Sequence, residues 1–320
     1  MKPLLVFFFM FSFGLMGYGQ PKVILDADID SDVDDVAALA MLNMLHNNKQ
    51  VELIGVVVTS DDPYAAACAD AINHYFGNNK IPIGFLHGLD QLKNHSKYTK
   101  QVSEEFEHSV KTYSDAEDAV SLYRRLLATE KDNSVIVVTI GHLSSLQGLL
   151  KSGADQYSSL SGKELAHKKM LRWICMGGMF PAGKEANFYR PDPVSTGYCV
   201  RTWTKPVVFC GWEAGKEIIT GGEYLKKRLN ENNPVYRGFE LYNHFAGRPS
   251  WDQVAILLLT KESGQYFDLV KNGRCEVAPD GSNTWVKGEE SNQAYVALKN
   301  DIDPALVARH IDEMIINNKK

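Results

Sequence analysis

A ten-residue stretch near the N-terminus, residues 26–35, carries six carboxylates and constrains this chain more than any other feature. The apolar run before it, residues 23–25, predicts a short buried strand, and the apolar run after it, residues 36–42, predicts a buried helix. The acids therefore occupy a turn between a strand and a helix. Open α/β sheets place their ligand sites in such turns.

Carboxylates this close together repel one another, which raises their pKa values or destabilises the folded chain. A hard cation bound by oxygen ligands removes the repulsion, and a flexible oxygen-rich turn suits Ca²⁺ or Mg²⁺. The alternative is a solvated acidic turn in which Asp34 and Asp35 cap the helix. Because apolar segments anchor the turn on both sides, the sequence favours the cation site.

Two familiar acidic motifs fit less well. In an EF-hand loop counted from Asp28, the position that requires glycine holds Val33, and the position that requires a bidentate glutamate holds Leu39. In a phosphatase with an Asp-x-Asp after its first strand, Asp26 and Asp28 would be nucleophile and acid. The later acidic magnesium turn of such enzymes is not found, so the phosphatase remains only an alternative.

The rest of the chain predicts one α/β domain over residues 21–320, with a mostly parallel central sheet flanked by helices and a Rossmann-like core. Near-continuous apolar runs are typical of buried parallel strands. Short strand-like segments between residues 264 and 298 predict antiparallel strands at one edge of the sheet. The apolar runs that predict the parallel strands are residues 51–58, 135–140, 171–176 and 206–210.

Residues 1–20 have the pattern of a signal peptide, with Lys2 before an apolar run and small residues at its end. We therefore expect an exported protein, periplasmic or extracellular, with no membrane attachment after cleavage. The apolar run is short for a membrane span, and no other stretch is long enough.

Charge and cysteine content reduce the number of possible partners and sites. The formal net charge is −5 and no basic cluster occurs, which argues against nucleic acid as a partner. The five cysteines are an odd number and several lie in apolar runs. They predict buried free thiols rather than a disulfide framework or a zinc site.

The acidic turn, with its strand, Asp-x-Asp, Asp-Asp and Ala-rich helix, resembles the opening of the inosine–uridine preferring nucleoside hydrolases, in a form with a longer turn. Further along, Met-Gly-Gly at residues 176–178, Glu-x-Asn at 185–187 and a late Asp at 252 follow in the order found in that family. The resemblance implies hydrolysis of the N-glycosidic bond of ribonucleosides with bound Ca²⁺. It also implies a nucleoside or riboside partner and a possible homo-oligomer.

The resemblance implies a role for each matching residue. Asp28 would be both an ion ligand and the base that deprotonates the attacking water. Asp34 would bind the 2′-hydroxyl, and Asp61 is a second-rank contact to the sugar. The remaining implied residues are Asp35, Asp252 and the carbonyl of Ile140 on the ion, and Glu185 and Asn187 on the sugar hydroxyls.

The leaving-group side departs from the family, which usually has His before the late Asp where this chain has Trp251. Indole donates a hydrogen bond but is no acid, although its face stacks on a base. His244, or else Tyr242, is the candidate replacement acid. General-acid help is worth about 10²–10⁴-fold, so two alternatives stay open: hydrolysis of a different riboside, or sugar or nucleoside binding without turnover.

Overall fold

The computed structural model describes residues 20–88, 91–288 and 290–316. The predicted signal peptide lies almost wholly outside the described residues. Within them, none of the helices combines the length and apolar character that crossing a membrane requires.

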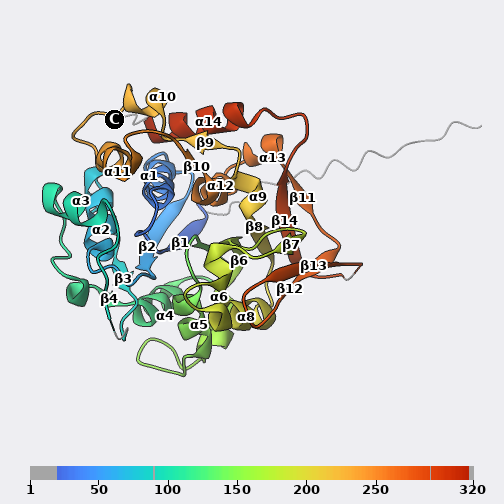
Figure 1. The fold of residues 1–320 in the computed structure, drawn as a ribbon. Coiled ribbons are helices and arrows are strands. Elements are labelled where there is room, and N and C mark those ends of the chain that lie inside the picture. The colour runs from blue at the N-terminus through green and yellow to red at the C-terminus, as the bar shows by residue number, and fades with distance from the viewer. Residues whose placement is uncertain (1–19, 89–90, 289, 317–320) are drawn as a thin grey trace, which may run out of the picture.

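A nine-stranded sheet forms the centre of the molecule, in the order β11-β14-β8-β6-β5-β1-β2-β3-β4 (Figure 1). All neighbouring strands in it run parallel except β11 and β14, which pair antiparallel at one edge. The prediction of a mostly parallel sheet with an antiparallel edge is therefore confirmed. The strands are β1 Lys22–Ala27, β2 Glu52–Val58, β3 Ile83–Phe85, β4 Glu117–Asp118, β5 Val135–Thr139, β6 Met170–Met176, β8 Val207–Cys210, β11 Phe267–Val270 and β14 Gln293–Leu298.

Helices cover both faces of this sheet. Figure 1 shows α4, α5, α6 and α8 on one side and α1, α11, α12 and α14 on the other. The helices are α1 Asp34–Asn47, α2 Ala65–Tyr75, α3 Thr99–Glu105, α4 Ala119–Thr129, α5 Ser144–Lys151, α6 Gly162–Lys169, α7 Ala186–Tyr189, α8 Pro193–Thr202, α9 Trp212–Gly215, α10 Glu223–Lys226, α11 Pro234–Asn243, α12 Trp251–Leu257, α13 Ser263–Tyr266 and α14 Pro304–Ile316, with a 3₁₀ turn at Tyr113–Asp115.

Two smaller sheets lie outside the central one. They are β12 (Gly273–Val277) with β13 (Asn283–Lys287) and β7 (Ala182–Gly183), and β9 (Ile219–Thr220) with β10 (Arg248–Pro249). The strand-like segments near the C-terminus therefore divide between the sheet edge and a separate antiparallel sheet.

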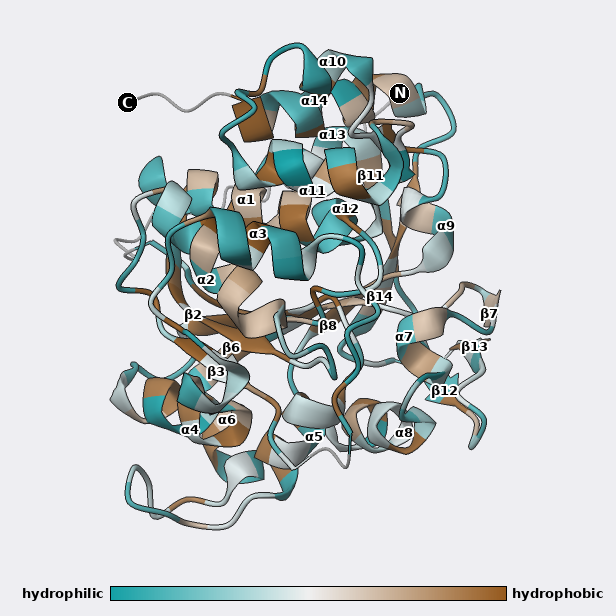
Figure 2. Ribbon diagram, turned by 60° about the vertical axis from the view of Figure 1, so that its left-hand side comes forward, coloured by the Kyte–Doolittle hydropathy of each residue, from teal (hydrophilic) through white to brown (hydrophobic). Residues whose placement is uncertain are grey.

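The core follows from the two-residue period of the strands. In β1, Val23 and Leu25 pack toward the α1 side, whereas Ile24 packs toward the α4 side. Both cores are apolar, so the strands read as continuous hydrophobic runs. Figure 2 shows hydrophobic β2 and β6 in brown between helices that carry both hydrophobic and hydrophilic residues.

The strand order reverses between β1 and β5. From β1 the chain moves to β2, β3 and β4 on one side, and from β5 to β6 and β8 on the other. The loops that leave the two strands diverge there and open a crevice at their carboxyl ends, which is where doubly wound sheets bind ligands. The acidic turn follows β1, so it lies at this switch point.

All five cysteines are buried free thiols, as the sequence predicts.

Candidate active site

The acidic turn and the late Asp meet at the carboxyl edge of the sheet. Asp28 follows β1, and Asp34 and Asp35 are the first two residues of α1. Asp252 lies in the first turn of α12, and its backbone N–H donates to Asp34 Oδ2 over 3.4 Å. Repulsion from Asp28 helps to raise the pKa of Asp35, so these two carboxyl groups lie close together. Side chains 218 residues apart thus form one carboxylate cluster.

This cluster is buried. The side chains of Asp34, Asp35 and Asp252 are at most 4 % exposed, which excludes a solvated turn. Burial, reinforced by repulsion from neighbouring carboxylates, holds the pKa of Asp28, Asp34, Asp35 and Asp252 well above the usual range. Neither helix uses these acids as N-caps, because Val33 and Ser250 hold those positions.

The turn after β5 closes the cluster from the other side of the switch point. The Ile140 N–H donates to the Asp26 carbonyl over 2.8 Å. At Gly141 a Cβ atom would lie 2.9 Å from Asp28 Cγ, so only glycine permits this approach. The Ile140 carbonyl accepts a 3.0 Å hydrogen bond from Asn187 Nδ2. Ile140 and Asn187, both predicted site residues, therefore meet beside Asp28.

Glu185 holds the loop that carries Asn187. Its Oε2 accepts from the Gly178 N–H and its Oε1 from the Asn187 N–H, each over 2.9 Å. The Glu-x-Asn segment is not extended, because Glu185 is the N-cap of α7 and Asn187 lies in its first turn. Burial raises the pKa of Glu185 to about 7, against the opposing effect of those N–H donors. Glu185 therefore positions the loop as well as bordering the site.

Asp26 lies beneath the site. Its carboxylate accepts hydrogen bonds from the Thr59 hydroxyl and, over 2.7 Å, from the Tyr123 hydroxyl. It is 1 % exposed, and burial raises its pKa to about 7. Both oxygens are occupied in the interior, which argues against Asp26 as a phosphatase nucleophile.

Arg248, for which the sequence gives no signal, contacts the longer part of the turn. Its guanidinium pairs with Asp32, and its Nε lies 3.8 Å from Asp34 Oδ1. The same group lies over the Trp251 ring at 4.8 Å and the Tyr242 ring at 5.7 Å. No sequence spacing reveals this contact, because Arg248 and Asp32 are 216 residues apart.

The two leaving-group candidates differ in their surroundings. The Trp251 indole N–H donates to the Trp212 carbonyl over 2.8 Å, so that donor is already used. His244 is an exposed residue in the left-handed conformation at the end of α11. Among the residues the structure describes, its side chain has no hydrogen bond or ion pair. The structure thus links Trp251 to Arg248, and among the described residues it gives the His244 side chain no comparable polar contact.

Asp61 belongs to a second cluster of charged side chains, formed with Asp30 and His95 at the more exposed mouth of the site. His95 Nε2 lies 3.4 Å from Asp30 Oδ1, and His95 Nδ1 lies 3.7 Å from Asp61 Oδ1. The three side chains are close enough for one ion to reach all of them. Because each ring nitrogen faces a different carboxylate, the geometry favours a protonated imidazole bridging two acids. Nothing in the order of residues links His95 to the acidic turn, so its place here follows only from the fold.

The main cluster has the chemistry of a hard-cation site. Asp34 Oδ1 and Asp35 Oδ1 are buried, and neither has a hydrogen-bond partner among the described residues. The available ligands are carboxylate oxygens and the Ile140 carbonyl, which suit Ca²⁺ or Mg²⁺ rather than a thiophilic metal. The residues therefore fit the ion that the sequence implies.

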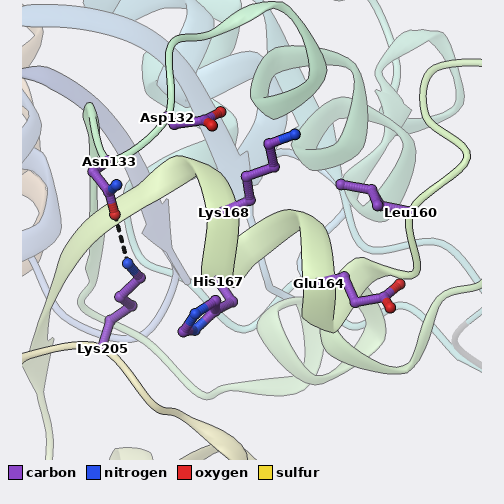
Figure 3. A pocket seen from close by; sticks show the side chains of 7 residues that line it. All are labelled: Asp132, Asn133, Leu160, Glu164, His167, Lys168 and Lys205. Carbon is purple, nitrogen blue, oxygen red and sulfur yellow. Dashed lines mark hydrogen bonds between the residues drawn. The ribbon is translucent and has the colours of Figure 1, made fainter.

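A separate open pocket lies at the opposite end of the sheet (Figure 3). Asn133, Lys168 and Lys205 line it, and they precede β5, β6 and β8, respectively. The acidic cluster lies at the carboxyl ends of the parallel strands. This pocket, at their amino ends, is thus remote from it.

The model of the inosine–uridine preferring nucleoside hydrolase family matches residues 23–313. The chain belongs to this family. Its members are metal-dependent hydrolases that act on N-glycosyl compounds, and the acidic turn, Glu185, Asn187 and Asp252 all fall inside the matched region.

Solved structures share the fold of this nucleoside hydrolase at low sequence identity. The inosine–uridine preferring nucleoside hydrolase from Bacillus anthracis superposes with a TM-score of 0.68 at 15% identity, covering 92% of this chain and 98% of that one. The plant nucleoside hydrolase PpNRh1 superposes with a TM-score of 0.66 at 15% identity, covering 93% of this chain and 99% of that one. The type III effector XopQ, complexed with adenosine diphosphate ribose, gives 0.64 at 12% identity, with 93% and 94% covered. No curated protein matches the chain in sequence.

Proposed function

We propose that this nucleoside hydrolase uses Ca²⁺ to cleave the N-glycosidic bond of ribonucleosides, releasing free base and ribose. The observation that carries the proposal is the cluster of Asp28 with the buried Asp35 and Asp252 beside the Ile140 carbonyl, at the switch point of the sheet. A cluster of this kind is costly to bury without a cation.

The ion would be held by Asp28, Asp35, Asp252 and the Ile140 carbonyl. When bound, a hard cation lowers the pKa of a coordinated water and orients sugar hydroxyls. Ca²⁺ suits the all-oxygen ligand set and a flexible turn, whereas Mg²⁺ demands stricter octahedral geometry.

The protein side chains would supply proton transfer and the contacts to the sugar. Asp28, whose pKa burial raises, would take the proton of the attacking water. Asp34, with one oxygen free of partners, would accept from the 2′-hydroxyl. Asn187 and Glu185 would bind further hydroxyls, and Asp61 would contact the substrate from the mouth. Carboxylates around the ring favour an oxocarbenium-like transition state.

A second candidate function is riboside binding without turnover. Trp251 favours it, because the family's usual acid is absent there and the indole N–H is committed to Trp212. The similar effector structure holds adenosine diphosphate ribose. A protein of this second kind would bind ribose or a nucleoside and release no sugar.

We further propose export to the periplasm or outside the cell, on the strength of the signal-like residues 1–20. Mass spectrometry of the N-terminus from the culture supernatant or periplasm tests this. A mature chain that still carries the leader would contradict export by cleavage.

The function is tested by reducing-sugar release from a panel of purine and pyrimidine nucleosides, with Ca²⁺ and then with a calcium chelator. Chelator-sensitive release of ribose would support the hydrolase and identify the base. Binding of ribose with no release from any nucleoside would support the second candidate. Release that the chelator leaves unchanged would contradict the proposed ion.

A further inference from the structure

The side chain beside Trp251 is charged. Arg248 lies three residues before Trp251 in the sequence, and its guanidinium lies 4.8 Å from the centre of the indole ring. The side chain is 25% exposed, so a ligand at the mouth can reach part of it. A permanently protonated group therefore occupies the neighbourhood of the position that holds the leaving-group acid elsewhere in the family.

The guanidinium also borders the sugar side of the site. Its Nε has no hydrogen-bond partner among the described residues, and neither does Asp34 Oδ1, 3.8 Å away. This separation is too long for a direct hydrogen bond. Asp32, on the longer turn, and the Trp251 and Tyr242 rings hold the group in this place.

We propose that Arg248 is a catalytic residue that stabilises the departing base as an anion by charge, in place of a proton donor. This inference rests on the proposed function. Arginine does not lose its proton at any working pH, so it cannot act as the missing acid. Its charge-assisted hydrogen bonds are nevertheless strong toward an anionic acceptor.

The reaction then balances without an enzyme-bound acid. The bond from the anomeric carbon to the base nitrogen breaks, and its electron pair stays on the base. A bond forms from the water oxygen to the same carbon, and the water proton passes to Asp28. The base leaves as an anion paired with Arg248, takes a proton from solvent, and Asp28 returns its proton to solvent.

The prediction concerns how the rate depends on the leaving group. Without Arg248, a poor leaving group suffers most, because an acidic phenol departs as a stable anion unaided. For Arg248→Gln we expect kcat/KM to fall about 10²–10³-fold on a nucleoside that the wild type cleaves, the usual loss on removing a charge-stabilising donor. On 4-nitrophenyl riboside the loss should be much smaller, and on phenyl riboside intermediate.

A purely structural role predicts a different pattern. If Arg248 only anchors the acidic turn through Asp32, its loss disturbs the site as a whole and reduces the rates on all three substrates equally. Equal losses would overturn the proposal, as would no loss on the nucleoside. Arg237→Gln, which removes a surface arginine paired with Glu105 and Glu240, is the matched control and should leave all rates unchanged.

Two further readings keep the test decisive. If Arg248→Gln does not fold, Arg248→Lys retains the charge opposite Asp32 but loses the planar donors. If kcat/KM of Arg248→Lys depends more steeply on the leaving group than kcat/KM of the wild type, the proposal is supported. If the dependence is unchanged, the proposal is overturned. If the wild type cleaves aryl ribosides but no nucleoside, the proposed substrate is wrong, whereas the phenyl and 4-nitrophenyl comparison still tests Arg248.

Discussion

His95 Nε2 and Asp30 Oδ1 lie 3.4 Å apart, which ties the loop between β3 and α3 to the acidic turn after β1. The hydrogen bond to Asp30 raises the pKa of His95 to about 9, so the imidazole is protonated at neutral pH. Asp62, next to Asp61, holds the same loop by accepting from the Ser96 N–H and the Thr99 hydroxyl. The loop is thus fastened over one side of the site.

Replacing His95 by Asn should lower stability in a pH-dependent way. Because the folded-state pKa is raised from 6.5 to about 9, the contribution is fully present below about pH 6.5 and is lost as pH rises through 9. Since the His95 side chain is 42% exposed, solvent screens the ion pair and we expect no more than about 1 kcal/mol. Chemical denaturation of both proteins at pH 6 and pH 10 measures the difference. A difference that is equal at the two pH values would contradict the ion pair.

Removing one ligand of the proposed ion should remove its stabilising effect. Ca²⁺ at a hundred times its dissociation constant would stabilise the wild type by about 2.7 kcal/mol. Asp35→Asn should abolish most of that gain, because Asp35 lies at the centre of the carboxylate cluster. Thermal melts with and without Ca²⁺ give the comparison, with the exposed Asp268→Asn as control. Equal gains in wild type and Asp35→Asn would place the ion elsewhere.

Glu185→Gln should destabilise the loop and weaken sugar binding together. Each carboxylate oxygen of Glu185 accepts a hydrogen bond from a backbone N–H group. In Gln, an NH₂ group replaces one of these oxygens, so one backbone N–H loses its acceptor. An unsatisfied buried N–H costs about 1–3 kcal/mol. Denaturant unfolding and KM for a cleaved nucleoside measure the two effects. A variant with wild-type stability but a raised KM would show that Glu185 acts on the sugar alone.

His244→Ala should change little, because the side chain is exposed and its position at the end of α11 joins it to no site residue. Exposed substitutions of this kind stay within about 0.5 kcal/mol, or roughly twofold in rate. Steady-state kinetics on a nucleoside and on an aryl riboside measures this. A large loss confined to the nucleoside would restore His244 as the leaving-group acid.

Trp251→Phe should keep the aromatic face under Arg248 and lose the hydrogen bond to the Trp212 carbonyl. The expected cost is about 1 kcal/mol of stability, the net worth of one hydrogen bond, with activity largely retained. Trp251→Ala should lose more activity, because Arg248 loses the ring on which it lies. Equal activity in the two variants would show that the ring has no part in placing Arg248.

The fold and the centre of the site were predictable because their signals are local. The β1 run, the acids and the start of α1 are consecutive, so strand, turn and helix follow from neighbouring residues. The motif order then brought in Glu185 and Asn187, but it gave no sign of the short helix α7 that Glu185 caps.

The basic residues at the mouth were not predictable. Arg248 and His95 meet the turn only through folding, across 216 residues in the case of Arg248 and Asp32. Both pair with acids of the longer turn, Asp32 and Asp30, respectively. The sequence displays the acids but does not show which distant cations approach them. Likewise, only the fold reveals that the Trp251 N–H is already occupied.

The distance along the chain between Asp34 and Asp252 has a consequence for biosynthesis. These residues are 218 positions apart, so most of the acids leave the ribosome long before their last partner, and loop closure of this length comes late in folding. A nascent or truncated chain ending before Asp252 therefore displays the acidic turn without one of the proposed ligands of the ion. Capture of the proposed ion would therefore come late in folding, and it would require a chain synthesised at least as far as Asp252.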